Sequence, residues 1–570
     1  MKSLMRYLKN YKKESVIGPL FKLLEACFEL IVPLVMAKII DVGIKNNDTV
    51  YIFKMGGVLV LFGILGLACS LTAQFFAAKA AVGFGTELRH DLFCHIGQLS
   101  YSEIDLCGNA TLITRMTSDI NQVQSGVNLV LRLFLRSPFI VVGAMVLAFT
   151  ISIKLAVIFL IAVPVLSIVI YGIMMLTIPL YKKVQKGLDQ VLLSTRENLS
   201  GVRVVRAFCT QEKERDSFQN SNEQLMDLQL FVGKISALLN PVTYVIVNLS
   251  IIAILWFGGR EVYIGTLTQG EVVALINYMS QILLALLALS NLIVAFTKAI
   301  ASADRINDVF KLETNIKDGK EKYAEEEKEK SVKVEHVSFA YKGDKEPVLE
   351  DICLSVDKGE TVGIIGGTGS GKTTLINLFP RFYEVSEGNI FINGRNVKDY
   401  VISDLRNVFG IVPQKAVLFH GTIRENMKYA KEDASDEEII RALDIAQAEG
   451  ELKNLDKKIS EGGKNLSGGQ KQRLTIARAL VKDPQILIMD DSSSALDFAT
   501  ESKLRKQISK EAENRTVFIV SQRAASIMHA DKIIVLENGK IAGCGKHDEL
   551  LKKCGVYREI CNSQLSGEGV

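Results

Sequence analysis

The chain has 570 residues, of which 48% are hydrophobic, and its net charge of +4 is close to neutral for this length. Because no basic block stands out, the charge balance gives no indication of nucleic-acid binding. The nine cysteines are scattered and form no CxxC pair, which favours reduced thiols over a disulfide framework or a zinc site.

Apolar residues are concentrated before about residue 300 and charged residues after it, which predicts a membrane half followed by a soluble half. A membrane-spanning helix needs about 20 largely apolar residues. Six segments meet or approach this requirement, although charges interrupt the first and the third. The predicted spans lie near residues 16–40, 55–78, 127–153, 155–181, 235–259 and 272–297.

Two connections between the predicted spans are long, at Lys79–Leu131 and Lys182–Lys234. Both contain few prolines and carry apolar residues at helical spacing, which predicts helices that continue beyond the bilayer. The second connection is rich in lysine and arginine, and such an excess is typical of cytoplasmic segments. We therefore expect a multi-pass protein of the cell membrane, with its N-terminus and its soluble half both in the cytoplasm.

Two acidic residues, Glu25 and Glu29, lie one helical turn apart on the first predicted span. A charge inside the bilayer is costly, so this pair is expected to face the interior of the helix bundle or a watery cavity. One interpretation is a substrate-cavity contact for a cationic molecule. The other is pairing with Arg132 or Arg136, or a hydrated helix end.

The segment 313–330 is dense in lysine and glutamate, which predicts a solvated linker between a domain at 1–312 and another at 331–570. The second domain shows short β-branched segments that alternate with helical ones. This pattern predicts an α/β domain with a mainly parallel sheet. Its predicted strands include Val332–Val337, Thr361–Ile365 and Gln485–Met489.

A glycine-rich loop follows the predicted strand Thr361–Ile365 and opens a helical stretch, in the pattern GxxxxGK[ST]. Such a loop directs backbone N–H groups and a helix N-terminus at phosphates. Lys372 can reach the β- and γ-phosphates of ATP, and the Thr373 hydroxyl can bind Mg²⁺. The predicted ATP-binding residues of the loop are Gly366, Gly367, Thr368, Gly369, Ser370, Gly371, Lys372, Thr373 and Thr374.

Two further motifs follow the loop. The apolar run Ile486–Met489 ends in Asp490, which is placed to hold Mg²⁺, most simply through water. Between the loop and this strand lies the sequence Leu466, Ser467, Gly468, Gly469 and Gln470.

The order of these motifs resembles that of the ATP-binding-cassette (ABC) family, and the six preceding spans resemble its multidrug and lipid exporter branch. The resemblance covers nearly the whole chain. It implies a multidomain fold, with a six-helix α-helical transmembrane domain followed by an α/β P-loop ATP-binding cassette. It also implies that Tyr341 stacks on adenine, that Gln414 contacts Mg²⁺, and that Asp497 is the D-loop aspartate.

The resemblance further implies that two cassettes dimerise head to tail around two ATP molecules. The signature Leu466–Gln470 would then act on the ATP bound to the partner chain. The segments around Leu106–Leu112 and Leu199–Phe208 would be coupling helices that carry cassette closure into the membrane.

Two positions at the catalytic centre depart from the family pattern. Asp491 stands where the family has a glutamate that polarises the attacking water, and Gln522 stands where it has a histidine. One methylene fewer withdraws the carboxylate by about 1.5 Å, and a misplacement of about 1 Å can cost on the order of 10²-fold in rate. Glutamine cannot become cationic or relay a proton.

These departures predict a degenerate ATP site on this chain beside an intact signature. The sequence therefore favours a heterodimer with a second, non-identical half-transporter, at whose site most hydrolysis occurs. The predicted function is ATP-driven, multidrug-type export of amphipathic small molecules across the membrane. Alternatives are a lipid or lipopeptide exporter and, from another class, a regulatory ATP sensor or nucleotide-gated membrane protein.

Overall fold

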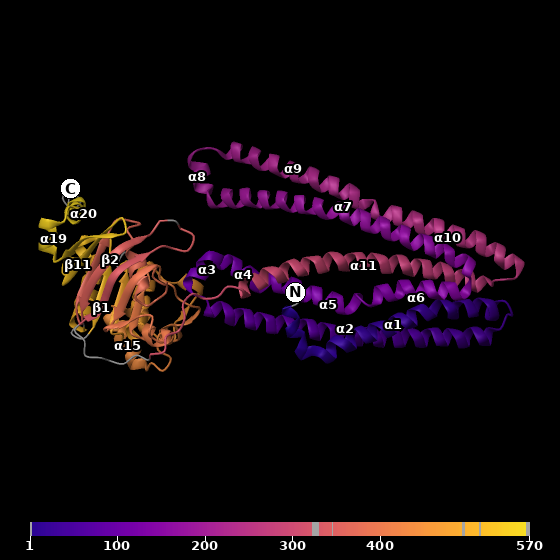
Figure 1. Ribbon diagram of the computed structural model, residues 1–570, viewed down its shortest axis with the longest axis horizontal. Helices are drawn as coiled ribbons and strands as arrows, with labels where there is room; N and C mark the ends of the chain where they lie inside the picture. The colour runs from indigo at the N-terminus through magenta and orange to yellow at the C-terminus, as the bar shows by residue number, and fades with distance from the viewer. Residues whose placement is uncertain (1–2, 322–329, 345, 493–495, 512–514, 566–570) are drawn as a thin grey trace. The chain divides into compact units, whose positions relative to one another are not determined.

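The computed structural model describes residues 3–321, 330–344, 346–492, 496–511 and 515–565 (Figure 1). Residues 322–329 of the predicted linker lie outside this set. The chain forms two compact units, one of Met1–Gly97 with Ala110–Lys311 and the other of Gln98–Asn109 with Leu312–Val570. The division after Lys311 lies one residue before the predicted end of the first domain at residue 312, and the second unit also includes Gln98–Asn109, which the prediction placed in the first domain. All nine cysteines are free thiols.

The first unit is helical. Its elements are η1 Leu4–Tyr11, α1 Lys12–Lys38, η2 Ile39–Ile44, α2 Thr49–Gln98, α4 Asn109–Thr114, η3 Arg115–Asp119, α5 Ile120–Leu133, α6 Arg136–Ile151, α7 Ile153–Ser200, α8 Val202–Ala207, α9 Gln211–Ala237, α10 Leu239–Ile264 and α11 Gln269–Phe310.

Within the described residues, five helical segments are long and apolar enough to cross a membrane. Four of them contain a predicted span in full, and a fifth contains the span near 127–153 up to Ile151. These helices are Thr49–Gln98, Asn109–Ile151, Ile153–Ser200, Gln211–Ile264 and Gln269–Phe310. Helix α1 is also long, but its charges keep it outside this set, so the first span remains a prediction. Its apolar residues Ala26 and Leu30 nevertheless belong to the core that the spanning helices share.

Helix α11 holds this core together. Its buried face carries residues from Val272 to Leu286, packed against α1, α6, α7 and α10. The Tyr278 hydroxyl donates to the carbonyl of Leu30 at 2.8 Å, which ties α11 to α1. At the start of α11, Asp41 accepts from the backbone N–H of Gly270 at 2.8 Å, so the loop before the helix is fixed as well.

The helices extend well beyond the predicted spans, which confirms the expectation for both long connections. Helix α7 continues to Ser200 and lies beside α9, and the short helix α8 joins their ends (Figure 1). All six residues of α8 are at least partly exposed, and its flanking residues Leu199 and Phe208 are 72% and 75% exposed.

The second unit contains two larger sheets. Its strands are β1 Lys330–Phe339, β2 Leu349–Asp357, β3 Thr361–Gly366, β4 Glu387–Ile392, β5 Arg395–Asn396, β6 Phe409–Val412, β7 Gly421–Thr422, β8 Lys458–Ile459, β9 Ile486–Asp490, β10 Thr516–Val520, β11 Lys532–Glu537 and β12 Lys540–Gly545. Its helices are α3 Tyr101–Cys107, α12 Lys372–Leu378, α13 Ile402–Asn407, α14 Ile423–Lys428, α15 Asp436–Ile445, η4 Gly450–Lys453, η5 Glu461–Gly463, α16 Gly468–Val481, α17 Phe498–Glu511, α18 Ala524–Ile527, α19 His547–Lys553 and α20 Gly555–Leu565.

The six-stranded sheet has the order β12-β11-β3-β10-β9-β6, and it is parallel except for β12. This agrees with the predicted parallel sheet. The predicted strand Val332–Val337, however, lies in β1 of a separate antiparallel sheet with the order β2-β1-β4-β5. One apolar core contains strands of both sheets, and a second contains β9 with the helices α14–α17.

Helix α3 packs against the second unit through aromatic and polar contacts. The Tyr101 ring lies edge-on to Phe382, with ring centroids 4.8 Å apart. The Tyr383 hydroxyl donates to Asp105 at 2.6 Å, and Glu103 is buried. The helix in this region spans Tyr101–Cys107 and ends at Gly108 with φ +75°, so it begins before the segment expected at Leu106–Leu112. The coupling role of this segment remains a prediction.

The predicted linker is partly ordered on the second unit. Ile316 is buried, the Asp318 carboxylate accepts from the backbone N–H of Ile402 at 2.7 Å, and Glu321 pairs with Arg395 at 2.9 Å. A segment of this composition cannot form a core of its own, but it can pack on the surface of a folded domain through one apolar side chain, hydrogen bonds and ion pairs. The expectation of a wholly solvated linker is therefore wrong for residues 313–321.

Replacing Tyr101 by alanine tests the attachment of α3. Loss of an aromatic pair costs about 1 kcal/mol, so we expect amide hydrogen exchange in residues 98–109 to become roughly fivefold faster, a factor that follows from this energy. Leu106→Ala, at a residue that is 51% exposed, is the matched control. Unchanged exchange in the Tyr101→Ala variant would contradict this account.

Candidate functional site

The glycine-rich loop connects the end of β3 to the start of α12. Gly369 and Gly371 have φ values of +81° and +92°, which side chains disfavour. A Cβ atom on Gly371 would also lie 2.6 Å from Leu349 of β2. Glycine at these positions therefore allows the loop to curl at the N-terminus of α12, where backbone N–H groups favour anions.

The Lys372 ammonium group lies across this loop. Its Nζ donates to the carbonyls of Gly366 and Gly367 at 2.8 and 2.6 Å and to the Ser370 hydroxyl at 3.3 Å. Burial lowers the pKa of Lys372, while the nearby Asp490 and Asp491 oppose this change. Phosphate oxygens would supply further negative charge, which favours the cationic form of the lysine.

Thr373 and Asp490 lie together at the ends of the loop and of β9. The Thr373 hydroxyl contacts the two carboxylate oxygens of Asp490 at 3.1 and 3.0 Å. Burial raises the pKa of Asp490, the Thr373 hydrogen bond opposes this rise, and the neighbouring Asp491 adds to it. The exposed Thr373 hydroxyl and the buried Asp490 carboxylate fit a Mg²⁺ ion bound with ATP, since oxygen ligands suit Mg²⁺.

A cavity of about 240 Å³ joins these groups to the two unusual positions. The Gln414 side chain reaches Asp491 at 3.5 Å, a long hydrogen bond. Asp491 itself has φ +44°, in the left-handed region that aspartate tolerates better than most residues. The lining residues are Val348, Thr368, Gly369, Gly371, Lys372, Thr373, Thr374, Gln414, Asp490, Asp491, Val520, Ser521 and Gln522.

Some lining residues were not identified from the sequence. Val348 lies before β2, and Ser521 follows β10 with its hydroxyl accepting from the backbone N–H of Arg523 at 2.9 Å. The carboxyl ends of parallel strands meet at one edge of a sheet. Ser521 could therefore have been found by recognising β10 as the neighbour of β3, whereas Val348 directly precedes β2 of the unforeseen antiparallel sheet.

Tyr341 lies beside the cavity rather than among its lining residues. Its hydroxyl is 2.9 Å from the Thr374 hydroxyl, and its ring contacts Phe339 and Tyr383 edge to face. These contacts fix the ring next to the start of α12. Stacking on adenine remains a prediction for this residue.

The signature segment is organised separately from this cavity. Ser467 caps α16, its hydroxyl accepts from the backbone N–H of Gln470 at 3.3 Å, and the Gln470 side chain accepts from the backbone N–H of Ser467 at 2.9 Å. Leu466 is buried, whereas Ser467 and Gly468 are exposed. The helix N-terminus is therefore available to an anion outside this chain.

Asp497 stands at the start of α17 and accepts from the backbone N–H of Thr500 at 3.0 Å. Hydrogen bonds from the side chain and the backbone of Thr500 lower the pKa of Asp497. Ser494 and Ala495 of the same motif lie outside the described residues. The side chain of Asp497 thus acts as a helix cap, and its predicted D-loop role remains a prediction.

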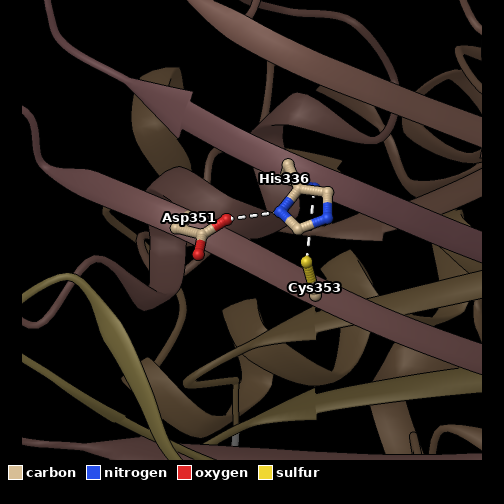
Figure 2. Close-up of side chains that lie close together, drawn as sticks. All are labelled: His336, Asp351 and Cys353. Carbon is tan, nitrogen blue, oxygen red and sulfur yellow. Dashed lines mark hydrogen bonds and ion pairs between the residues drawn. The ribbon is translucent and has the colours of Figure 1, made fainter.

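Among the residues that the structure describes, one group that could hold a metal ion, His336, Asp351 and Cys353, lies on the antiparallel sheet (Figure 2). Nδ1 of His336 is 2.7 Å from Asp351, and the His336 backbone N–H donates to the Cys353 sulfur at 3.3 Å. Imidazole, carboxylate and thiolate are ligand types for Zn²⁺. All three residues are exposed. The contact between His336 and Asp351 is that of a surface pair and needs no metal ion, so we assign the cluster no role in nucleotide binding.

Comparisons with known families agree with both units. Residues 15–286 match the family described as the ABC transporter transmembrane region, and residues 349–494 match the family described as ABC transporter. In structure, the chain is similar to a bacterial Atm1-family ABC exporter with ATP bound, with a TM-score of 0.79 over 98% of this chain and 99% of that one. At 24% identity, this likeness supports the fold alone.

Several relatives match over most of their length. The chain is 37% identical to the uncharacterized ABC transporter ATP-binding protein YfiB of Bacillus subtilis, over 100% of this chain and 99% of that protein. It is 32% identical to YgaD of the same organism, provisionally named a multidrug export ATP-binding/permease protein, over 99% of both chains. It is 34% identical to the ATP-dependent lipid A-core flippase of Desulfotalea psychrophila, over 84% of each chain.

Replacing Asp490 by asparagine tests the electrostatics of the site. Because burial raises the pKa of Asp490, its ionised form is less favourable in the folded than in the unfolded chain. We expect a higher melting temperature at pH 7.5 without nucleotide, and a gain that shrinks as the pH falls from the folded towards the unfolded pKa. Affinity for Mg-ATP should fall about tenfold or more.

Scanning fluorimetry and nucleotide binding with and without Mg²⁺ measure these two effects. Asp433→Asn, at an exposed position, is the matched control. A lower melting temperature for Asp490→Asn, or an unchanged Mg²⁺ requirement, would argue against the proposed electrostatics.

Proposed function

Because the chain belongs to the ABC transporter family, as an exporter with fused transmembrane and ATP-binding domains, we propose that it is one half of a heterodimer with a slow ATP site. ATP drives export by this multi-pass membrane protein. The proposed substrates are amphipathic small molecules. The proposed partner is a second, non-identical half-transporter.

The carrying observation is that Asp491 and Gln522 line the same cavity as Lys372, Thr373 and Asp490. The residues that suit phosphate and Mg²⁺ follow the family pattern, while the two positions that would activate water do not. The Asp491 carboxylate, shorter than glutamate by one methylene, is withdrawn by about 1.5 Å. The Gln522 amide cannot become cationic. Such a site retains ATP better than it hydrolyses it.

In this mechanism, Lys372 binds the terminal phosphates, while Thr373, Asp490 and Gln414 would hold Mg²⁺, which neutralises phosphate charge when bound. Tyr341 would orient adenine, and Asp497 would order the chain beside the dimer interface. Asp491 and Gln522 would align water poorly. Ser467 and Gly468 would complete the partner's site, where most hydrolysis would occur.

Two exposed features support the need for a second chain. The first is the N-terminus of α16 at Ser467, which this chain leaves open to an outside anion. The second is α8 with Leu199 and Phe208, whose apolar surface is exposed at the tip of the α7–α9 arm. We interpret α8 as the coupling helix that contacts the partner's cassette, and α3 as the one that contacts its own.

The identity of the cargo has two candidate answers. Similarity to YgaD supports export of small amphipathic molecules, and similarity to a lipid A-core flippase supports a lipid-like cargo as the second candidate. Both share an apolar part and a polar part. A regulatory ATP sensor, the alternative from another class, would not move either of them.

Restoring the family residues at positions 491 and 522 tests the degenerate site. The purified chain alone is expected to hydrolyse Mg-ATP slowly, and Asp491→Glu with Gln522→His should raise turnover by about 10²-fold because the base regains its reach. Adding Ser467→Ala to that variant should reduce the gain, since the signature acts on the opposite ATP. Brisk turnover by the unmodified chain, abolished by Asp491→Asn, would rule out the proposal.

Transport itself can be tested in inverted vesicles that contain this chain and its partner. ATP should drive accumulation of a fluorescent amphipathic dye, and Lys372→Ala should reduce it because phosphate binding is impaired. Vesicles with this chain alone are the control for the heterodimer. ATP binding without any ATP-dependent accumulation would favour the sensor alternative.

A further inference from the structure

The charged residues of the predicted spans are confined to two of the six. The spans near residues 55–78, 155–181, 235–259 and 272–297 contain no lysine, arginine, aspartate or glutamate. Away from the span ends, the first span carries Lys22, Glu25 and Glu29, and the third carries Arg132 and Arg136. Charges at membrane depth are costly. We therefore expect the charged side chains on these two helices either to pair fully with one another or to bind a ligand.

The acidic members of this cluster are already paired within the chain. Lys22 lies 2.6 Å from Glu25 and also donates to Ser70 at 3.2 Å. Arg136 contacts Glu29 at 2.8 Å and is 3.9 Å from Glu25. The carboxylates therefore have cationic partners before any substrate binds, which weighs against a cationic substrate at Glu25 and Glu29.

The basic members are not fully paired. Arg132 has no hydrogen-bond or ion-pair partner within the described part of the chain, and its Nε is buried. Nε of Arg136 is likewise buried without a hydrogen-bond partner among these residues. With three cations against two carboxylates, the cluster keeps one positive charge.

The two arginines lie on one helical face. They are four residues apart, and Phe134 and Leu135 between them keep right-handed helical angles, so α5 runs into α6 without reversing direction. Phe139, one turn beyond Arg136, is 38% exposed and offers an apolar neighbour. Guanidinium groups bind carboxylate and phosphate oxygens through paired hydrogen bonds.

We propose that Arg132 and Arg136 bind an anionic headgroup, a carboxylate, sulfate or phosphate, on an amphipathic substrate. This inference rests on the proposed export of amphipathic molecules and adds that their polar headgroup is negatively charged. Lys22 neutralises Glu25 and Glu29 engages one edge of Arg136, so Arg132 and the free edge of Arg136 face the substrate's anion. The same chemistry would recognise an anionic lipid or a water-soluble amphiphile.

Equilibrium binding to the full chain in phosphatidylcholine nanodiscs tests this site. Decyl phosphate and decyl sulfate should bind more tightly than decyltrimethylammonium by calorimetry, with empty nanodiscs subtracted. Arg132→Gln should weaken decyl phosphate binding about tenfold, the loss expected for a charge-assisted hydrogen bond. Arg260→Gln, at an exposed residue near the end of α10, should leave binding unchanged.

Glu29→Gln gives an effect of opposite sign. Removing this carboxylate frees Arg136, so decyl phosphate should bind several-fold more tightly, whereas a cation site would lose decyltrimethylammonium. Dioleoyl phosphatidic acid in the nanodiscs should displace decyl phosphate if the natural source is a lipid, and should leave it bound if the source is water-soluble. Both results are consistent with an anion site and differ only in the source of the natural anion.

Equal affinity for the three probes, no binding of decyl phosphate, or unchanged binding by Arg132→Gln would overturn the inference. Arg132 has no partner to lose within the described residues, so its glutamine variant should fold, which gel filtration checks. These measurements need no ATP turnover. Their failure is therefore distinguishable from failure of the degenerate-site proposal, which the hydrolysis rate decides.

Discussion

The cost of holding charge in apolar surroundings governs both units of this protein. In the helical unit, it draws Lys22, Glu25 and Glu29 of α1 into contact with Arg136 of α6 and Ser70 of α2. In the cassette, it alters the pKa values of Lys372 and Asp490 in opposite directions, each toward the neutral form. Both sites are stabilised when a ligand of opposite charge binds, because the ligand offsets the free-energy cost of burying the charged side chain.

Much of the cassette could be predicted from the sequence because its motifs are local. The loop Gly366–Thr373 follows its strand directly, and the ends of β3, β9 and β10 meet at one edge of the parallel sheet. The roles of Lys372, Thr373 and Asp490 follow from their residue types once they are brought to that edge. The five uncharged or largely apolar spans are equally local signals of composition.

Other features depend on contacts that no local pattern encodes. Glu29 and Arg136 are 107 residues apart, so pairing was one of two open interpretations from the sequence. The attachment of α3 depends on Tyr383, 278 residues away from Asp105. The antiparallel sheet and the ordered residues 313–321 were missed because composition describes a segment without the surface on which it packs.

The apolar tip formed by Leu199, α8 and Phe208 has a consequence for biosynthesis. In the proposed heterodimer, a subunit made without its partner would expose this apolar tip to solvent, where hydrophobic surface promotes aggregation and attracts chaperones and proteases. Balanced production of both subunits, with early pairing at the ribosome-bound or newly inserted stage, would shield it. The surface that we interpret as a coupling helix would thus also mark an unpaired subunit for degradation.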